Sequence, residues 1–157
     1  MPGLLPARIA AALLLLVVAF QVALVVGAPW GSWTQGGSHS GSLPGDARFF
    51  AATSAMLLVV MALSILARVG HGPFVSLPRP LQTFLAWATT VYAGISVLLN
   101  LVTPSGSERA LFAPVALVTF VCCVLTLRAT RRPDSAHTTT TESADVPSTP
   151  DPDGSST

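Results

Sequence analysis

Two cysteines and three histidines are the side chains in this sequence best suited to hold a metal or a redox cofactor. Cys122 and Cys123 are adjacent in an apolar segment, so on a helix their side chains point about 100° apart. A zinc site usually has about four such ligands, and the neighbouring sequence supplies no others. The histidines, at His39, His71 and His137, lie outside the apolar segments and cannot face one another across a haem. We therefore expect no metal and no cofactor, and we interpret the cysteines as small packing residues.

Charged residues are absent from the centres of the apolar segments, which limits the chemistry further. Proton relays and ion-coupled transporters place charged side chains at that depth, because only function repays the cost of burying them. No serine or cysteine stands near both a histidine and a carboxylate, and no glycine-rich phosphate loop occurs. The sequence therefore predicts a protein that is not an enzyme, does not bind nucleic acid, and has the lipid bilayer as its first partner.

One apolar segment carries an organised set of polar residues. Thr89, Ala93, Ser96 and Asn100 recur every three or four residues and share one helical face. An adjacent face carries the small residues Ala86, Thr90 and Gly94. Small residues let membrane helices approach closely, and hydroxyls and amides bond across such contacts. We interpret both faces as internal packing surfaces; a dimer interface or a polar-lined pocket is the alternative.

Four apolar segments must position these residues, each long enough to cross a membrane as a helix of about 20 residues. The predicted helices are Ile9–Ala28, Phe49–Ala67, Leu81–Val102 and Ala110–Leu127. Asp46 and Ser107 are the predicted N-caps of the second and fourth helices, and Pro80 suits the first turn of the third. We predict an all-α fold: an up-down-up-down bundle of four transmembrane helices within residues 1–132.

The first apolar segment also has features of a secretion signal, because Arg8 precedes it and small residues end it. Its apolar run is longer than the roughly 7–15 residues of such signals. Pro29 would also follow the cleavage point. We therefore interpret this segment as a retained helix.

Composition and charge agree with a membrane protein. Hydrophobic residues make up 51% of the chain and charged residues 10%, whereas soluble domains are about a quarter charged. All eight basic residues are arginines. In the predicted bundle the arginines on the side of the two termini are Arg8, Arg68, Arg79, Arg128, Arg131 and Arg132, and those on the other side are Arg48 and Arg109. Because basic residues favour the cytoplasmic side, we predict a multi-pass protein of the cell (plasma) membrane with both termini in the cytoplasm.

The last part of the chain differs from the rest. Residues 133–157 are rich in Thr, Ser, Pro and Asp and carry a net charge of −5, whereas residues 1–132 carry +6. A segment with so few apolar residues cannot bury enough surface to fold. We predict a disordered cytoplasmic tail.

Four polar residues are predicted to meet on the outer side: Arg48, Asn100, Glu108 and Arg109. Glu108 stands near a helix N-terminus, where the helix dipole favours a negative charge, and we predict an ion pair between Glu108 and Arg48 or Arg109. Since surface ion pairs are common and weak, a structural role is the first interpretation of this cluster. A ligand-binding or partner-binding role is the second.

The same region carries motifs of a family. The first outer segment reads GAPWG at Gly27–Gly31, followed by Gly36-Gly37, Leu43-Pro44 and Arg48, and the second has Asn100 and then SGSERALFAPVAL from Ser105. This combination resembles a group of uncharacterised bacterial integral membrane proteins with four helices. The resemblance implies a signature at the outer side that includes Pro114, and no established activity. A candidate lid loop over the helix ends comprises Gly27, Pro29, Trp30, Gly31, Gly37 and Pro44, with Trp30 and Trp33 at the outer interface.

Three functions are compatible with these residues. The first is a non-enzymatic structural or accessory subunit that binds another membrane protein or a second copy of itself. The second is a small oligomeric transporter or exporter that uses the polar third helix as its path. The third, least favoured, is a membrane enzyme acting on lipid with Glu108 as acid or base.

Overall fold

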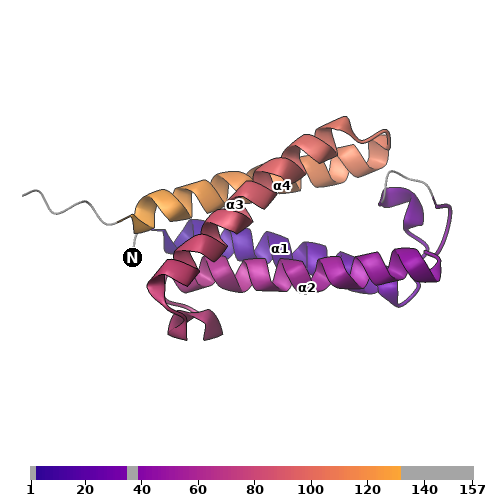
Figure 1. The fold of residues 1–157 in the computed structure, drawn as a ribbon. Helices are drawn as coiled ribbons and strands as arrows, with labels where there is room; N and C mark the ends of the chain where they lie inside the picture. Colours follow the sequence, from indigo (N-terminus) through magenta and orange to yellow (C-terminus); the bar gives the residue numbers. More distant parts are fainter. Residues whose placement is uncertain (1–2, 35–38, 132–157) are drawn as a thin grey trace, which may run out of the picture.

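The computed structural model describes residues 3–34 and 39–131, and four long helices dominate them (Figure 1). The helices are α1 (Leu4–Val25), α2 (Gly45–Arg68), α3 (Arg79–Val102) and α4 (Gly106–Thr130), with short 3-10 turns at η1 (Gly31–Trp33) and η3 (Pro73–Ser76). Each long helix is long and apolar enough to cross a membrane. The predicted all-helical, up-down-up-down bundle is confirmed, and the chain is a multi-pass membrane protein. The predicted tail at 133–157 lies outside the described residues.

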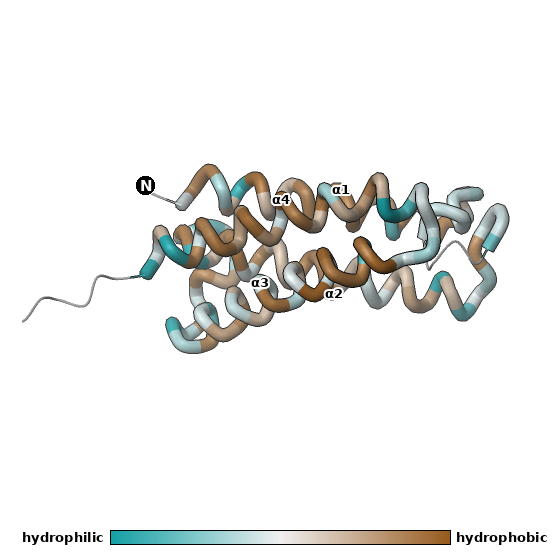
Figure 2. The backbone as a smooth tube through the Cα atoms, turned by 90° about the horizontal axis from the view of Figure 1, so that it is seen from above, coloured by the Kyte–Doolittle hydropathy of each residue, from teal (hydrophilic) through white to brown (hydrophobic). Residues whose placement is uncertain are grey.

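Large apolar side chains point away from the bundle along most of its length. Examples are Phe49, Met56 and Val102, of which 70%, 74% and 80% of the surface is exposed. Figure 2 shows apolar residues along the bodies of the helices and hydrophilic residues gathered toward the ends. Such an exterior would associate non-specifically in water, so the bilayer is the environment in which this surface is stable.

The helix ends differ from the predicted ones by a few residues. α2 follows the extended Pro44, so Asp46 lies in the first turn and is not the cap. The N-cap of α4 is Ser105, whose hydroxyl accepts a hydrogen bond from the Glu108 backbone N–H, and not Ser107. α1 ends at Val25, before Gly27 with its φ of 101°. Polar first turns extend a helix beyond its apolar run, and hydropathy alone does not detect them.

Pro80 lies in the first turn of α3, as predicted, where it sacrifices no helical hydrogen bond. Pro114 lies inside α4. Figure 1 shows α1 and α2 side by side. α3 starts beside the C-terminal end of α2 and crosses the bundle to lie along α4. α3 therefore leaves α2 as it approaches its own C-terminal end.

Small residues fill the core. One cluster joins all four helices at the end of the bundle where α1 begins and α4 ends. It includes Ala7, Ile65, Ala86, Cys123 and Leu127. Toward the other end, two further clusters join α1 to α2 and the loop between them. The core thus joins all four helices at one end and chiefly α1 and α2 at the other.

The small-residue face of α3 packs on α4, which confirms internal packing for that face. Ala86 lies in the core cluster with both cysteines, and Thr90 is buried. A Cβ atom at Gly94 would come within 3.2 Å of the Phe120 ring on α4. This close approach is what small residues permit in a membrane bundle.

Candidate functional site

A polar cleft opens where α3 leaves α2, and we call it the Asn100 cleft. All four helices line it, and its volume is about 190 Å³. Its deeper wall is apolar, with residues such as Leu14, Leu58 and Met61. Its polar lining consists of Gln21, Thr34, Ser54, Thr89, Tyr92, Ser96, Asn100, Glu108 and Thr119.

The polar face predicted for the third helix forms one wall of this cleft. Thr89, Ala93, Ser96 and Asn100 all line it, so the shared face is confirmed. α3 provides this wall because its polar residues recur at helical spacing, whereas α1, α2 and α4 are apolar almost all round. The sequence alone left internal packing and a polar-lined pocket open for this face, and the geometry favours the pocket.

Hydrogen bonds within the helices determine what the cleft offers to a binding partner. Thr89 donates its hydroxyl proton to the Leu85 carbonyl at 2.9 Å, and Thr119 donates to Val115 O at 2.8 Å. The Asn100 amide nitrogen donates to Ser96 O at 2.8 Å and to Ser96 Oγ at 3.2 Å. A hydroxyl that has donated its proton keeps lone pairs to accept with. The wall is therefore richer in acceptors than in donors.

Glu108 adds a carboxylate at the mouth of the cleft, and its position is fixed by the turn before α4. Its Oε2 atom accepts a hydrogen bond from Thr103 Oγ1 at 3.1 Å, and its backbone N–H is capped by Ser105. Asn100 and Glu108 also line a second, adjoining hollow of about 240 Å³ with Tyr92 and Ser96. These two predicted site residues are thus brought together.

The other two members of the predicted polar cluster lie apart from the cleft. Arg48 donates from Nε to the Leu43 carbonyl at 2.7 Å, which ties the start of α2 to the preceding loop. Its guanidinium also lies 3.5 Å from the position that a Cβ at Gly27 would occupy. Arg109 is exposed on the first turn of α4. Arg48 thus holds the backbone of the loop before α2.

The candidate lid loop folds back over the ends of α1 and α4 in the part that the structure describes. Trp30 stacks on Phe20 of α1 with ring centroids 5.9 Å apart. Ser105 Oγ, at the start of α4, donates to Ser32 O at 3.4 Å. The buried Thr34 reaches the cleft lining.

A tight backbone contact holds this loop. The Gly31 N–H donates to Gly41 O at 2.8 Å, and a Cβ at Gly31 would lie only 2.8 Å from that oxygen. Pro29 and Pro44 are exposed, and Pro44 immediately precedes α2. The candidate lid residue Gly37 lies outside the described residues.

No histidine or cysteine of the described residues lines the cleft. Cys122 and Cys123 are buried in the core cluster, which agrees with their interpretation as packing residues. His71 Nδ1 lies 3.0 Å from Val69 O in the loop after α2. Over residues 3–34 and 39–131, no three His, Cys, Asp or Glu side chains come together as a metal site would require.

Sequence reasoning missed several residues that the structure places at sites. Gln21, Ser54 and Thr119 line the Asn100 cleft from three different helices. Each is the kind of isolated polar residue in an apolar run that most often points inward in a membrane bundle, so their polarity was the available signal. At the opposite end, Arg68 and Gln82 form a second polar group that the arginine distribution alone did not reveal.

Comparisons with protein-family models, with curated proteins and with solved structures return no match to this chain. The resemblance to a group of small four-helix membrane proteins therefore stays a prediction.

Proposed function

We propose that this protein is a non-enzymatic accessory subunit of the cell membrane, and that a transmembrane helix of another membrane protein docks at the Asn100 cleft. The observation that carries the proposal is the polar wall of α3, which the divergence of α3 from α2 leaves uncovered within a membrane-spanning segment. Tyr92 is 39% exposed there, and Ser96 and Asn100 are half-buried.

Polar groups at this depth favour a protein partner over lipid tails. Hydrocarbon offers no hydrogen bonds, so an amide or carboxylate facing it carries a desolvation cost that a partner removes. Interhelical hydrogen bonds in membranes contribute roughly 0.6–2 kcal/mol each. Several such bonds along the wall, together with close packing, supply enough free energy for stable association.

The chemistry of the cleft also selects the partner. Because the half-buried Asn100 keeps its carbonyl as an acceptor, while Thr89 and Thr119 are almost fully buried, the complementary helix carries a donor at the depth of Asn100. Glu108 at the mouth suits a cationic side chain near the end of that helix. Asn, Gln, Trp or hydroxyl residues deeper in the helix and a Lys or Arg at its end would satisfy the cleft.

Site-specific photo-crosslinking tests this proposal. A benzophenone amino acid at Tyr92, which lines the cleft, should give one discrete protein adduct in membranes. The same probe at Val91, exposed on another face of α3, is the matched control and should react mainly with lipid. An adduct of twice the chain mass would indicate a second copy as the occupant, and equal patterns at both positions would contradict the proposal.

A substitution pair adds an independent measurement. Ser96→Leu adds bulk and removes a hydroxyl inside the cleft, so we expect loss of the copurifying partner in mild detergent. Thr53→Leu makes a comparable change at an exposed position of α2 and should leave the partner bound. Both variants should unfold at similar temperatures if the effect belongs to the interface.

The second candidate is a small oligomeric transporter, which the cleft volume of about 190 Å³ favours because it could hold a small polar solute. Its test is solute flux into vesicles that contain only this protein. Flux that Ser96→Leu abolishes, without any protein adduct at Tyr92, would replace the accessory role by transport.

A further inference from the structure

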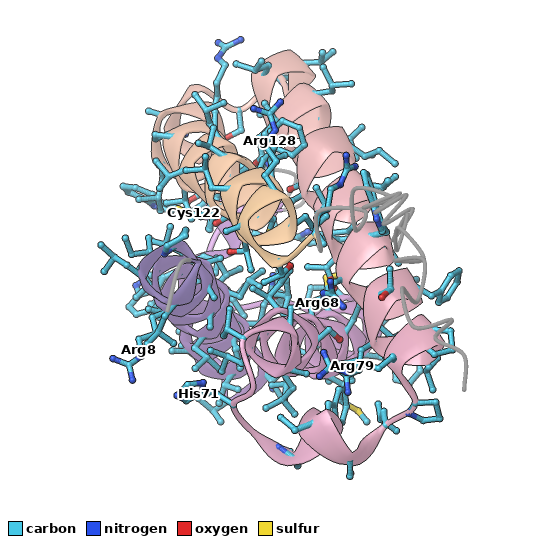
Figure 3. All side chains as sticks on the ribbon, turned by 90° about the vertical axis from the view of Figure 1, so that its left-hand side faces the viewer. Arg8, Arg68, His71, Arg79, Cys122 and Arg128 are labelled. Atoms are coloured by element: carbon cyan, nitrogen blue, oxygen red, sulfur yellow. The ribbon has the colours of Figure 1, made fainter. Side chains whose placement is uncertain are left out.

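A second pocket lies at the opposite end of the bundle, where α2 ends, α3 begins and α4 ends. We call it the Arg68 pocket. Its volume is about 320 Å³. Figure 3 looks onto this end of the molecule, with Arg68 and Arg79 on the side of α2 and α3 and with Arg8 and Arg128 apart from them. The polar residues that line the pocket are Arg68, Arg79, Gln82 and Thr130.

The Arg68 guanidinium is held in place from two helices. Nη1 donates to Thr83 Oγ1 on α3 at 3.0 Å, and Nη2 donates to the carbonyl and the hydroxyl of Thr130 on α4, both at 3.3 Å. The third nitrogen, Nε, is buried and has no hydrogen-bond partner among the described residues. A buried donor of a charged group without a partner is costly, so this atom indicates that an acceptor is missing from the pocket.

The Gln82 side chain has an acceptor atom that lacks a donor. Its amide nitrogen donates to Val75 O at 2.9 Å and to Leu77 O at 2.8 Å, which fixes the orientation of the amide. Its carbonyl oxygen Oε1 is buried without a hydrogen-bond partner among the described residues, and the side chain as a whole is only 3% exposed. The pocket therefore lacks a donor as well as an acceptor.

The positive charges that line the pocket indicate that the missing acceptor is an anion. Arg79 lines the pocket and its charge acts on Arg68, so the two like charges repel. The only carboxylates among the described residues, Asp46 and Glu108, belong to the first turns of α2 and α4 at the other end of the bundle. An anion would relieve this repulsion, and phosphate oxygens match a guanidinium fork.

We propose that the Arg68 pocket binds the headgroup of an anionic glycerophospholipid, with its phosphodiester on Arg68 and Arg79 and a headgroup hydroxyl donating to Gln82 Oε1. A hydroxyl suits this position better than an ammonium group, which the two arginines would repel. The pocket lies at the ends of membrane-spanning helices, where basic pockets between helices meet lipid headgroups. Leu81 and the 67% exposed Phe84 lie in the first turns of the same helix and provide apolar surface for acyl chains at this end of the bundle.

Native mass spectrometry of the full-length chain in detergent tests the site. Phosphatidylglycerol, which has both the phosphodiester and a hydroxyl donor, should bind more tightly than phosphatidylcholine, which lacks the donor. Glycerol 3-phosphate carries a phosphate ester and hydroxyl donors without acyl chains and should not displace the lipid at equal concentration. Displacement by glycerol 3-phosphate would identify a soluble phosphate ester as the ligand and overturn the lipid assignment.

Two arginine variants separate this pocket from general surface charge. Arg79→Gln should weaken phosphatidylglycerol binding about tenfold, the loss expected for one charge-assisted contact to phosphate. Arg128→Gln removes the same charge from an exposed position at the same end of the bundle and should change binding by less than about twofold. Equal effects of the two variants would overturn the proposal.

A final variant tests whether the acidic segment at 133–157 occupies the Arg68 pocket in place of a lipid. Its carboxylates are Asp134, Glu142, Asp145, Asp151 and Asp153. Binding of phosphatidylglycerol that does not change when these five become amides supports a lipid site. Binding that appears only after the change would assign the pocket to the chain itself and contradict the proposal.

Discussion

At the scale of single residues, the reach of a polar side chain decides whether it bonds within its own helix or joins two elements of the bundle. The hydroxyls of Ser64, Thr90 and Thr126 each donate to the carbonyl four residues earlier in their own helix. Such bonds remove the cost of burial without joining helices. The longer side chains of Arg68 and Gln82 instead reach another helix or a loop. The Arg68 pocket therefore forms around long polar side chains, whereas the Asn100 cleft is lined mostly by short ones.

Gln82 gives the first prediction at this scale. Gln82→Leu removes the donors to the carbonyls of Val75 and Leu77, so we expect a loss of about 1–3 kcal/mol in the free energy of unfolding. Thr53→Val, which removes one exposed bond within α2, is the control and should cost less than about 0.5 kcal/mol. Denaturant unfolding in detergent measures both. Similar losses would mean that Gln82 does not hold the loop after α2.

Gly31 gives the second prediction. A Cβ at this position would meet Gly41 O at 2.8 Å and His39 O at 2.9 Å, and backbone oxygens cannot turn aside as a side chain can. Gly31→Ala should therefore destabilise the loop by about 1–3 kcal/mol, as overpacking does. Gly45→Ala, with open space around the added methyl group, should be neutral or slightly stabilising. Proteolysis rates of this loop provide the measurement, and equal rates for the two variants would refute the prediction.

At the scale of elements, α3 connects the two proposed sites. Arg79 and Gln82 in its first turns line the Arg68 pocket, whereas Ser96 and Asn100 near its end line the Asn100 cleft. Between them, the Gly94 face packs closely on α4. Because α3 crosses from α2 to α4 (Figure 1), each end of α3 exposes a polar face. Helices packed in parallel would cover these faces.

The beginning of α4 provides a prediction about an element boundary. Ser105→Ala removes the cap that accepts from the Glu108 N–H, and the expected cost is about 1 kcal/mol of helix stability. Ser107→Ala changes the residue that hydropathy and sequence pattern favour as the cap, and its effect should stay within about 0.5 kcal/mol. Thermal unfolding in detergent distinguishes them. A larger loss for Ser107→Ala would place the helix start where the sequence predicted it.

The sequence predicts helix interiors well and site membership less well, for physical reasons. Apolar runs identify all four spans, and helical spacing correctly groups Thr89, Ser96 and Asn100 on one face. The predicted grouping of Arg48, Asn100, Glu108 and Arg109 rested only on their common end of the bundle, and among them the lining of the cleft includes Asn100 and Glu108. Which residues of one end touch depends on helix crossing and loop path, and neither is encoded in local periodicity. Arg48 therefore donates to the Leu43 carbonyl, a contact that no sequence pattern predicts.

At the scale of the whole molecule, charge is divided between the two ends of the bundle. Arg8, Arg68, Arg79, Arg128 and Arg131 belong to the end with the N-terminus, where Arg131 also lies over the Trp87 ring at 5.5 Å. The opposite end carries Arg48, Arg109 and the carboxylates Asp46 and Glu108. The basic end should therefore face the cytoplasm, because basic residues resist translocation. The lipid site would then face the inner leaflet and the partner cleft the outer half.

Cysteine labelling tests this orientation. With Cys122 and Cys123 replaced by alanine, Ser40→Cys and Ser76→Cys place single exposed thiols in the loops at opposite ends of the bundle. A membrane-impermeant maleimide should label Ser40→Cys in intact cells and Ser76→Cys only after permeabilisation. The reverse pattern would invert the topology. It would also move the Arg68 pocket to the outer leaflet, so phosphatidylglycerol binding in detergent would survive while its assignment to the cytoplasmic leaflet would not.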